Sequence, residues 1–344
     1  MGGLESARAE WEGRAAPLLR AAVRERALAS TAAERTLRRL GADPRRLLDP
    51  RGVRVLCLDG GGIRGLVLVE LLRELEAATG RRARDLFDIV CGTSTGGLVA
   101  VALLLGKSLD DVQAAYMALS NAVFRKGWFS AAQQLTYTGA KYDSRVLEEL
   151  LRDEYGDPHL LDTPPSPRTF VVSTVSSLVP CQPFLWRNYA HPLSSPSRYR
   201  GTCDAPSVTA LLATSAAPSY FDEVSYGGAR HIDGALAANN PSAIAIHEAS
   251  RLFPGAPLHC LVSLATGSSP PRASPGAGVG LPGVLRALID SAIGPAPVAD
   301  CLEDLLPGGV YHRFAPQGAA FDVAIDQTDR AKVEGLRAAA LAYA

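Results

Sequence analysis

Two glycine-rich stretches of the sequence each follow an apolar run and contain residues that could do chemistry. The first, DGGGIRG (59–65), presents backbone N–H groups that no side chain obstructs, as an anion-binding loop requires. The second, GTSTG (92–96), has the G-x-S-x-G pattern of a nucleophile elbow, in which a sharp strand-to-helix turn exposes a serine hydroxyl. The anion could be a phosphate, a dinucleotide or an oxyanion made during a reaction.

The pattern GGGIRG (60–65) also matches the G-x-G-x-x-G fingerprint of dinucleotide-binding folds. Such a site needs an acidic residue at the C-terminal end of the next strand, where it binds the ribose. The available acids, Asp85 and Asp88, precede the next apolar run and so lie at its other end. A Walker loop needs Gly-Lys-Ser/Thr, which does not follow these glycines. The sequence therefore favours an oxyanion generated by the reaction.

An oxyanion hole beside a serine predicts acyl transfer. Ser94 is then the expected nucleophile, and Gly92 and Gly96 are the small residues that its tight turn requires. If both turns open at the same edge of a parallel sheet, N–H groups of the first loop lie next to Ser94. Donors of this kind stabilise a transition state by about 3–4 kcal/mol each.

Two residues compete for the role of proton acceptor. Asp233, in RHIDGALAANNP (230–241), stands in an Asp-Gly-Ala turn before a helix, where an acidic side chain could also simply cap the turn. His312, in GVYHRFAP (309–316), would complete a triad in the chain order of α/β-hydrolases, but lacks the loop-then-helix context of such histidines. A dyad and a triad both stay open on these residues.

The elements that must hold these residues alternate between apolar strands and helices. Strands are expected near 53–59, 87–92, 169–177 and 258–267, and helices near 66–80 and 98–107. Such alternation is typical of a parallel sheet with helices on both faces. We therefore expect an α/β fold whose central sheet is mostly parallel.

Composition limits the domain organisation and the partners. The 344 residues include 35 basic and 35 acidic side chains, a balance that argues against nucleic acid as the main partner. The six cysteines form no CxxC pair, and no secretory signal is seen, which favours an intracellular protein. We expect a helical basic N-terminal segment (1–52), a catalytic domain (53–248) and a C-terminal part (249–344) with a mobile loop at 268–283.

The motifs DGGGIRG, GTSTGG and DGA, in this order and spacing, resemble the patatin-like phospholipase family, and within it the calcium-independent gamma type. The likeness covers about residues 53–315 and extends to FLWRNYAH (184–191), ATSAAPSYF (213–221), NNPSAIAIHE (239–248) and LVSLATG (261–267). It implies a three-layer α/β/α fold with helical N-terminal and C-terminal extensions. It also implies calcium-independent hydrolysis of glycerophospholipid esters, giving lysophospholipid and free fatty acid, with no metal or other cofactor.

The resemblance also assigns roles to individual residues. Ser94 becomes the nucleophile of a Ser–Asp dyad that uses no histidine, and Asp233, in the DGA motif with Gly234 and Ala235, accepts its proton. Partial burial should raise the pKa of Asp233, because an ordinary aspartate near ~3.9 is a weak base. The implied oxyanion-hole residues are Gly60, Gly61, Gly62, Arg64 and Gly65.

A phospholipid substrate implies a peripheral contact with a membrane surface. The segment 121–143 places Phe124, Trp128 and Phe129 next to Arg125 and Lys126, residue types that suit a headgroup boundary. The same residues could form an ordinary helix end. The resemblance suggests mitochondrial, peroxisomal or endoplasmic reticulum membranes, although no targeting signal is seen; MGGLES (1–6) matches the pattern for myristoylation.

Two other functions stay open. The chain could be a non-catalytic lipid-binding protein on the same fold, although an intact serine, aspartate and glycine loop argue against it. It could also be a small-ester hydrolase that uses a Ser-Asp-His triad through His312.

Overall fold

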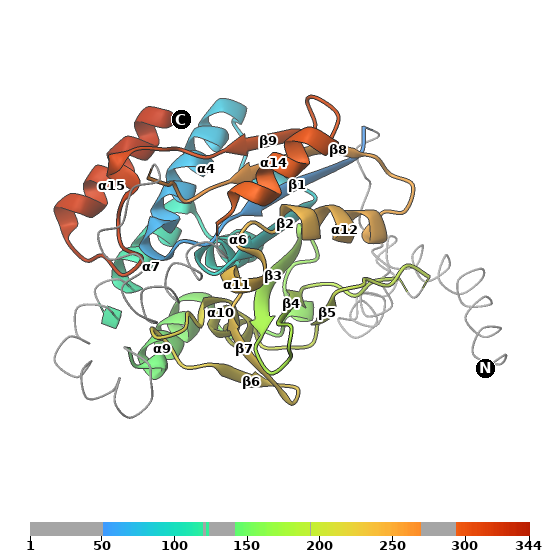
Figure 1. Cartoon of the computed structure of the whole chain (residues 1–344), viewed down its shortest axis with the longest axis horizontal. Coiled ribbons are helices and arrows are strands. Elements are labelled where there is room, and N and C mark those ends of the chain that lie inside the picture. The colour runs from blue at the N-terminus through green and yellow to red at the C-terminus, as the bar shows by residue number, and fades with distance from the viewer. Residues whose placement is uncertain (1–50, 120–121, 124–141, 193, 270–293) are drawn as a thin grey trace, which may run out of the picture.

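The structure of this chain is a computed structural model that describes residues 51–119, 122–123, 142–192, 194–269 and 294–344 (Figure 1). Within these residues the strands form one mixed sheet of nine. They are β1 (Val53–Leu58), β2 (Ile89–Thr93), β3 (Arg168–Val175), β4 (Gln182–Arg187), β5 (Arg200–Thr202), β6 (Val224–Tyr226), β7 (Ala229–Asp233), β8 (Leu258–Leu264) and β9 (Tyr311–Phe314).

The sheet has the order β5-β4-β3-β2-β1-β8-β9, with β7 paired to β3 and β6 paired to β7. The strands from β3 to β9 along this order are all parallel to their neighbours. Antiparallel pairs occur where β3 meets β4 and β7, and in the β6–β7 hairpin. The expected mostly parallel sheet is therefore confirmed, and the last described strands, β8 and β9, belong to it.

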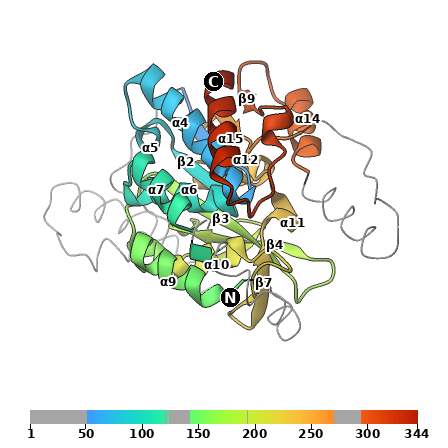
Figure 2. The same cartoon turned by 90° about the vertical axis from the view of Figure 1, so that its left-hand side faces the viewer.

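Helices cover both faces of the sheet, as Figure 2 shows. The longer ones are α4 (Gly65–Thr79), α6 (Thr95–Leu105), α7 (Leu109–Leu119), α9 (Ser144–Tyr155), α10 (Ser207–Ser215), α12 (Ser242–Leu252), α14 (Ala296–Leu305) and α15 (Arg330–Tyr343). Short ones are α5 (Ala83–Leu86), α11 (Ala235–Ala238) and the 3-10 turns η2 (Gly62–Arg64), η5 (Leu160–Asp162) and η6 (Ala319–Phe321).

The two faces of β1 show how the layers are held together. Leu56 and Leu58 pack into one core with α4, α6, α7, α9, α10 and α15. Val55 and Cys57 point to the other face and pack with α12. Because successive side chains of a strand alternate between faces, a strand between two helical layers must be apolar at every position. The expected three-layer α/β/α fold is confirmed.

Some sequence predictions concern residues that the structure does not describe. They include nearly all of the N-terminal segment (1–52) with its myristoylation pattern, the aromatic and basic residues of 124–129, and most of the loop 268–283. Among the described residues, no helix combines the length and the apolar character needed to cross a membrane.

The local boundaries follow the sequence signals closely. Helix α4 ends at Thr79, and Gly80 caps it with a left-handed φ of 64°, a conformation that favours glycine. Strand β2 and helix α6 meet at a single residue, Ser94, as a strand-turn-helix unit requires. The order of short strands and helices is thus encoded locally.

One feature of the sheet brings distant parts of the chain together. Strands β2 and β7 both pair with the same edge of β3. Thr93 of β2 pairs with Val172, and Asp233 of β7 pairs with the next residue, Ser173. Strand β4 occupies the opposite edge of β3. Strand β7 therefore runs antiparallel toward the C-terminal end of β2 and ends next to it.

Candidate active site

Ser94 occupies a strained turn between β2 and α6. Its φ of 52° and ψ of −122° make it, with Ser219, one of two non-glycine residues with positive φ in the described ranges. A Cβ on Gly92 would lie 2.1 Å from the Gly96 carbonyl oxygen, and one on Gly96 would lie 2.2 Å from that of Leu58. The turn is therefore as tight as a nucleophile elbow requires, and only glycine fits at these two positions.

Thr214, near the end of α10, fixes this turn from the side. Its Oγ1 accepts a hydrogen bond from the backbone N–H of Ser94 at 2.8 Å and donates one to the Val172 carbonyl oxygen. Thr214 itself is fully buried, and a satisfied hydrogen-bond network in the protein interior is rigid. A backbone strained at a functional site persists when its surroundings hold it in this way.

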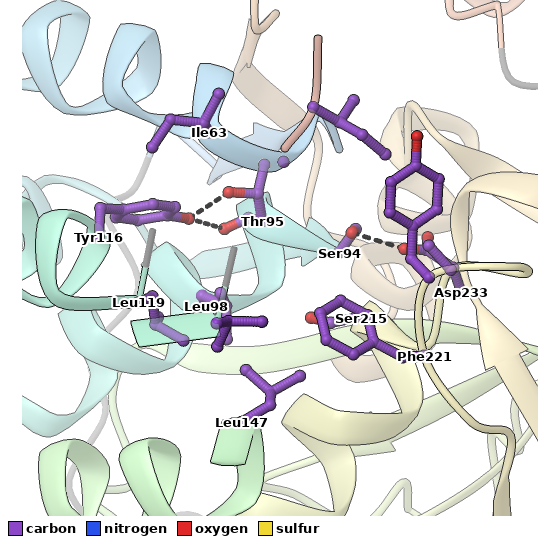
Figure 3. A pocket seen from close by; sticks show the side chains of 15 residues that line it. Ile63, Ser94, Thr95, Leu98, Tyr116, Leu119, Leu147, Ser215, Phe221 and Asp233 are labelled. Carbon is purple, nitrogen blue, oxygen red and sulfur yellow. Dashed lines mark hydrogen bonds between the residues drawn. The ribbon is translucent and has the colours of Figure 1, made fainter. Parts of the chain in front are cut away.

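The carboxylate of Asp233 accepts a hydrogen bond from the hydroxyl of Ser94, with Oγ donating to Oδ2 at 2.7 Å (Figure 3). The N–H of Ala235 donates to the other carboxylate oxygen at 2.8 Å. Burial raises the pKa of Asp233 to about 6, although these two hydrogen bonds lower it. Gly234 is required here because a Cβ would lie 2.1 Å from the Val172 carbonyl oxygen. The expected rise in the pKa is thus present.

His312 lies elsewhere in the molecule. It is exposed on β9, the edge strand beyond β8, and its Nε2 is 3.1 Å from the carbonyl oxygen of Gly309. Strands β2, β1 and β8 separate β9 from β3. The structure therefore does not bring His312 to the Ser94–Asp233 pair, and chain order alone is a poor guide to this residue.

The glycine loop lies directly beside the Ser94 turn. A Cβ on Gly60 would be 3.2 Å from the Cβ of Ser94 and 3.3 Å from the Thr93 carbonyl oxygen. Gly62 has a left-handed φ of 60° and lines the same pocket as Ser94. The two turns that the sequence singles out therefore meet at the C-terminal edge of β1 and β2.

Only some N–H groups of this loop are available. The N–H of Gly60 donates to Oδ1 of Asn239 at 3.0 Å, and that of Gly65 donates to the carbonyls of the preceding turn. Within the described ranges, the N–H groups of Gly61 and Gly62 have no acceptor. The backbone N–H of Arg64 also has an acceptor, the Gly61 carbonyl oxygen at 3.2 Å, so Gly61 and Gly62 are the predicted oxyanion-hole residues whose N–H groups remain open in these ranges.

The side chain of Arg64 contacts two backbone carbonyl groups. Its guanidinium is turned to the backbone, with Nε 3.4 Å from the Gly61 carbonyl oxygen and Nη1 3.2 Å from that of Gly267. Burial lowers the pKa of Arg64, but an arginine stays charged. Arg64 thus contacts the carbonyl side of the glycine loop.

An ion pair holds the start of the loop. Arg313 of β9 forms a bidentate pair with Asp59, at 3.0 and 2.5 Å, and also donates to Oγ of Ser263. Burial raises the pKa of Asp59 to about 6, although Arg313 lowers it. Both side chains are almost fully buried, so removal of one partner would leave an uncompensated buried charge.

A pocket of about 680 Å³, including its open mouth, begins at Ser94 and Asp233 (Figure 3). Leu98 of α6, Leu119 of α7 and Leu147 of α9 line its walls. The other lining residues are Gly62, Ile63, Thr95, Tyr116, Val123, Ser215, Ala217, Tyr220, Phe221 and Ile325. The reactive pair therefore stands at one end of a largely apolar space.

Three site residues escaped prediction: Thr214, Asn239 and Thr266. Each lies in a segment that carries the family resemblance, ATSAAPSYF, NNPSAIAIHE or LVSLATG. The resemblance indicated that these segments belong to the family pattern. Nothing in them shows which side chain contacts a backbone group more than 100 positions away in the sequence.

Comparison with known proteins identifies relatives of this chain. The sequence profile described as patatin-like phospholipase matches residues 56–246. Calcium-independent phospholipase A2-gamma of Homo sapiens is 36% identical over 300 residues, covering 85% of this chain and 38% of that protein. Phospholipase A I of Arabidopsis thaliana is 33% identical over 343 residues, covering 83% of this chain and 26% of that protein. This chain thus spans less than half the length of these relatives, and it belongs to the patatin-like phospholipase family.

Proposed function

We propose that this chain hydrolyses fatty acyl esters of glycerophospholipids, with Ser94 as nucleophile and Asp233 as general base. The observation that carries the proposal is the 2.7 Å hydrogen bond from Ser94 Oγ to Asp233 Oδ2 at the end of an apolar pocket. The names of the relatives, phospholipases A2-gamma and A I, support the substrate class. Such a substrate places the protein at a lipid surface as a peripheral protein.

In the acylation step, Ser94 Oγ attacks the ester carbonyl while Asp233 takes its proton. A base with a pKa near the working pH is the most effective, and a pKa of about 6 suits this task better than that of an exposed aspartate. The N–H of Ala235 holds the second carboxylate oxygen and so keeps Oδ2 directed at the serine. The proton then passes to the leaving lysophospholipid oxygen.

The tetrahedral intermediate carries a negative charge on the former carbonyl oxygen. We assign its stabilisation to the N–H groups of Gly61 and Gly62, which are the free donors of the loop in the described ranges. In deacylation, Asp233 takes a proton from water, which attacks the acyl-enzyme and releases the fatty acid and Ser94. Each proton that Asp233 accepts is returned within the same step.

The apolar walls of the pocket support a fatty acyl chain as the group that is bound. Leucines from α6, α7 and α9, with Phe221, give the chain apolar contacts along the pocket. Burial of each methylene contributes about 0.8 kcal/mol. A lipid-binding protein without activity would also use such walls, but it would not need the Ser94–Asp233 hydrogen bond at their end.

The acidity of Asp233 predicts a pH dependence. The base must be ionised, so kcat/KM should fall about tenfold per pH unit below a midpoint near 6. The measurement is the rate on a soluble p-nitrophenyl ester between pH 4.5 and 8, with circular dichroism at each pH to exclude unfolding. A midpoint near 4, or activity that rises toward low pH, would contradict the role of Asp233.

We expect activity to be independent of calcium. Nucleophile, base and oxyanion donors all come from the chain itself, and the relatives carry the name calcium-independent. In the described part of the chain, no three or more His, Cys, Asp or Glu side chains are grouped to hold a metal ion. Fatty acid release from phosphatidylcholine vesicles, measured by mass spectrometry, should be equal in excess EGTA and in millimolar calcium. A requirement for added calcium would overturn this expectation.

A further inference from the structure

Two successive carbonyl groups of the glycine loop are held by polar groups outside it or at its end. Thr266 Oγ1 donates a hydrogen bond to the carbonyl oxygen of Gly60 at 2.9 Å. The backbone N–H and Nε of Arg64 donate to the carbonyl oxygen of Gly61 at 3.2 and 3.4 Å. Each bond thus fixes one peptide plane of the loop.

The direction of these carbonyls determines the direction of the next N–H groups. In a planar trans peptide the C=O and the following N–H point in opposite directions. The Gly60 carbonyl therefore sets the N–H of Gly61, and the Gly61 carbonyl sets that of Gly62. Consecutive glycines offer little resistance to rotation of a peptide plane, so an outside contact has to fix it.

Thr266 itself is firmly placed. It follows β8, is only 4% exposed, and stands between two anchored residues. The preceding Ala265 donates its N–H to the Phe314 carbonyl of β9, and the carbonyl of the following Gly267 accepts Nη1 of Arg64. The threonine therefore offers its hydroxyl to Gly60 from a rigid support 206 positions away in the sequence.

We propose that Thr266 is a positioning residue of this enzyme, whose hydroxyl orients the Gly60–Gly61 peptide so that the Gly61 N–H faces the reacting carbonyl oxygen. This inference rests on the proposed function. The competing interpretation is that Thr266 only fills space, because its Oγ1, Cβ and Cγ2 lie 2.2–3.0 Å from where a Cβ on Gly61 would be. Substitution of Gly61 cannot separate the two, since alanine would collide with Thr266.

The test replaces the threonine and keeps the glycines. Thr266→Val retains the shape of the side chain without the hydroxyl. Thr266→Ala removes the hydroxyl without a new contact, and Thr266→Ser retains the hydroxyl. Thr163→Val is the matched control, because Thr163 is also buried and its Oγ1 also donates to a backbone carbonyl, that of Leu160, outside the site. All four variants are compared with the unmodified chain on a soluble p-nitrophenyl ester, with melting temperatures recorded.

We expect Thr266→Val and Thr266→Ala to lower kcat by about 10- to 100-fold with KM changed less than twofold. Thr266→Ser should keep kcat within about threefold, and Thr163→Val should keep both constants. A trifluoromethyl ketone, which forms an oxyanion on the serine, should bind the Val and Ala variants more weakly by a similar factor. A non-reactive alcohol analogue should bind all variants equally.

Two results would overturn the inference. One is a normal kcat in folded Thr266→Val and Thr266→Ala, and the other is an equal loss in Thr266→Ser. The proposed function is tested separately by Ser94→Ala in the same assay. If Ser94→Ala is inactive while Thr266→Val and Thr266→Ala turn over normally, only the role of Thr266 is rejected. If Ser94→Ala turns over like the unmodified chain, the proposed function is rejected, and the role of Thr266 is rejected with it.

Discussion

Replacement of Ser94 by alanine is expected to abolish ester hydrolysis while the protein remains folded. Loss of the serine removes the covalent route, so kcat should fall by about four to six orders of magnitude. The variant should also no longer react with a fluorophosphonate probe, because its phosphorus bonds to the activated hydroxyl. Mass spectrometry of the intact protein after labelling, together with fatty acid release from vesicles, measures both effects.

The backbone of Ser94 offers a matched control for this experiment. Its φ of 52° and ψ of −122° strain alanine as much as serine, so the melting temperature of Ser94→Ala should change only through the lost hydrogen bond to Asp233. Ser94→Gly should be as inactive as Ser94→Ala but melt at a higher temperature than Ser94→Ala, because glycine adopts positive φ without strain. Probe labelling that persists in a folded Ser94→Ala chain would show that another residue is the nucleophile.

Replacement of Asp233 by asparagine should lower kcat by about 10³- to 10⁴-fold, since the base is lost and the shape is kept. The same change should stabilise the fold near pH 8. The folded-state pKa of Asp233 is raised to about 6 from 3.8, so the ionised carboxylate opposes folding above pH 6. That difference corresponds to about 2–3 kcal/mol at neutral pH and falls below about 1 kcal/mol near pH 4, where the folded state is protonated and the unfolded state is partly ionised.

Denaturant unfolding at pH 4 and pH 8, with turnover measured in parallel, checks both parts of this prediction. The control is His312→Ala, which should change kcat by less than about tenfold, because the exposed imidazole bonds only to the Gly309 carbonyl among the described residues. If His312→Ala is the inactive variant and Asp233→Asn turns over normally, the triad hypothesis replaces the dyad.

The local features of this structure could be predicted from the sequence. Strand-turn-helix order through residue 107, the cap at Gly80 and the elbow around Ser94 depend on neighbours in the chain, so residue type and spacing reveal them. The short strands β5, β6 and β9 were not predicted, because they are three or four residues long and only partly buried. Packing against the rest of the sheet stabilises them.

In the candidate site, too, the local motifs could be predicted but the contacts between distant residues could not. Local motifs identified Ser94 and Asp233, but their contact depends on the register that sets Asp233 opposite Ser173 and beside the end of β2. The glycine pattern located the loop, yet the side chain of Asn239 decides that the Gly60 N–H is engaged. Contacts of this kind arise from the tertiary structure, and no periodicity or spacing encodes them.

The sharing of one β3 edge between β2 and β7 has a consequence for biosynthesis. Ser94 leaves the ribosome 139 residues before Asp233, and Gly60 leaves it 206 residues before Thr266. At about 5–20 residues per second, the second interval lasts roughly 10–40 s. During the first interval, between the emergence of Ser94 and that of Asp233, a nascent chain has its serine but neither its base nor the threonine that tethers its glycine loop. We therefore expect chains interrupted before residue 233 to lack ester hydrolase activity, since the proposed base has not yet been translated, and full activity to appear only once Thr266 has also packed against the loop.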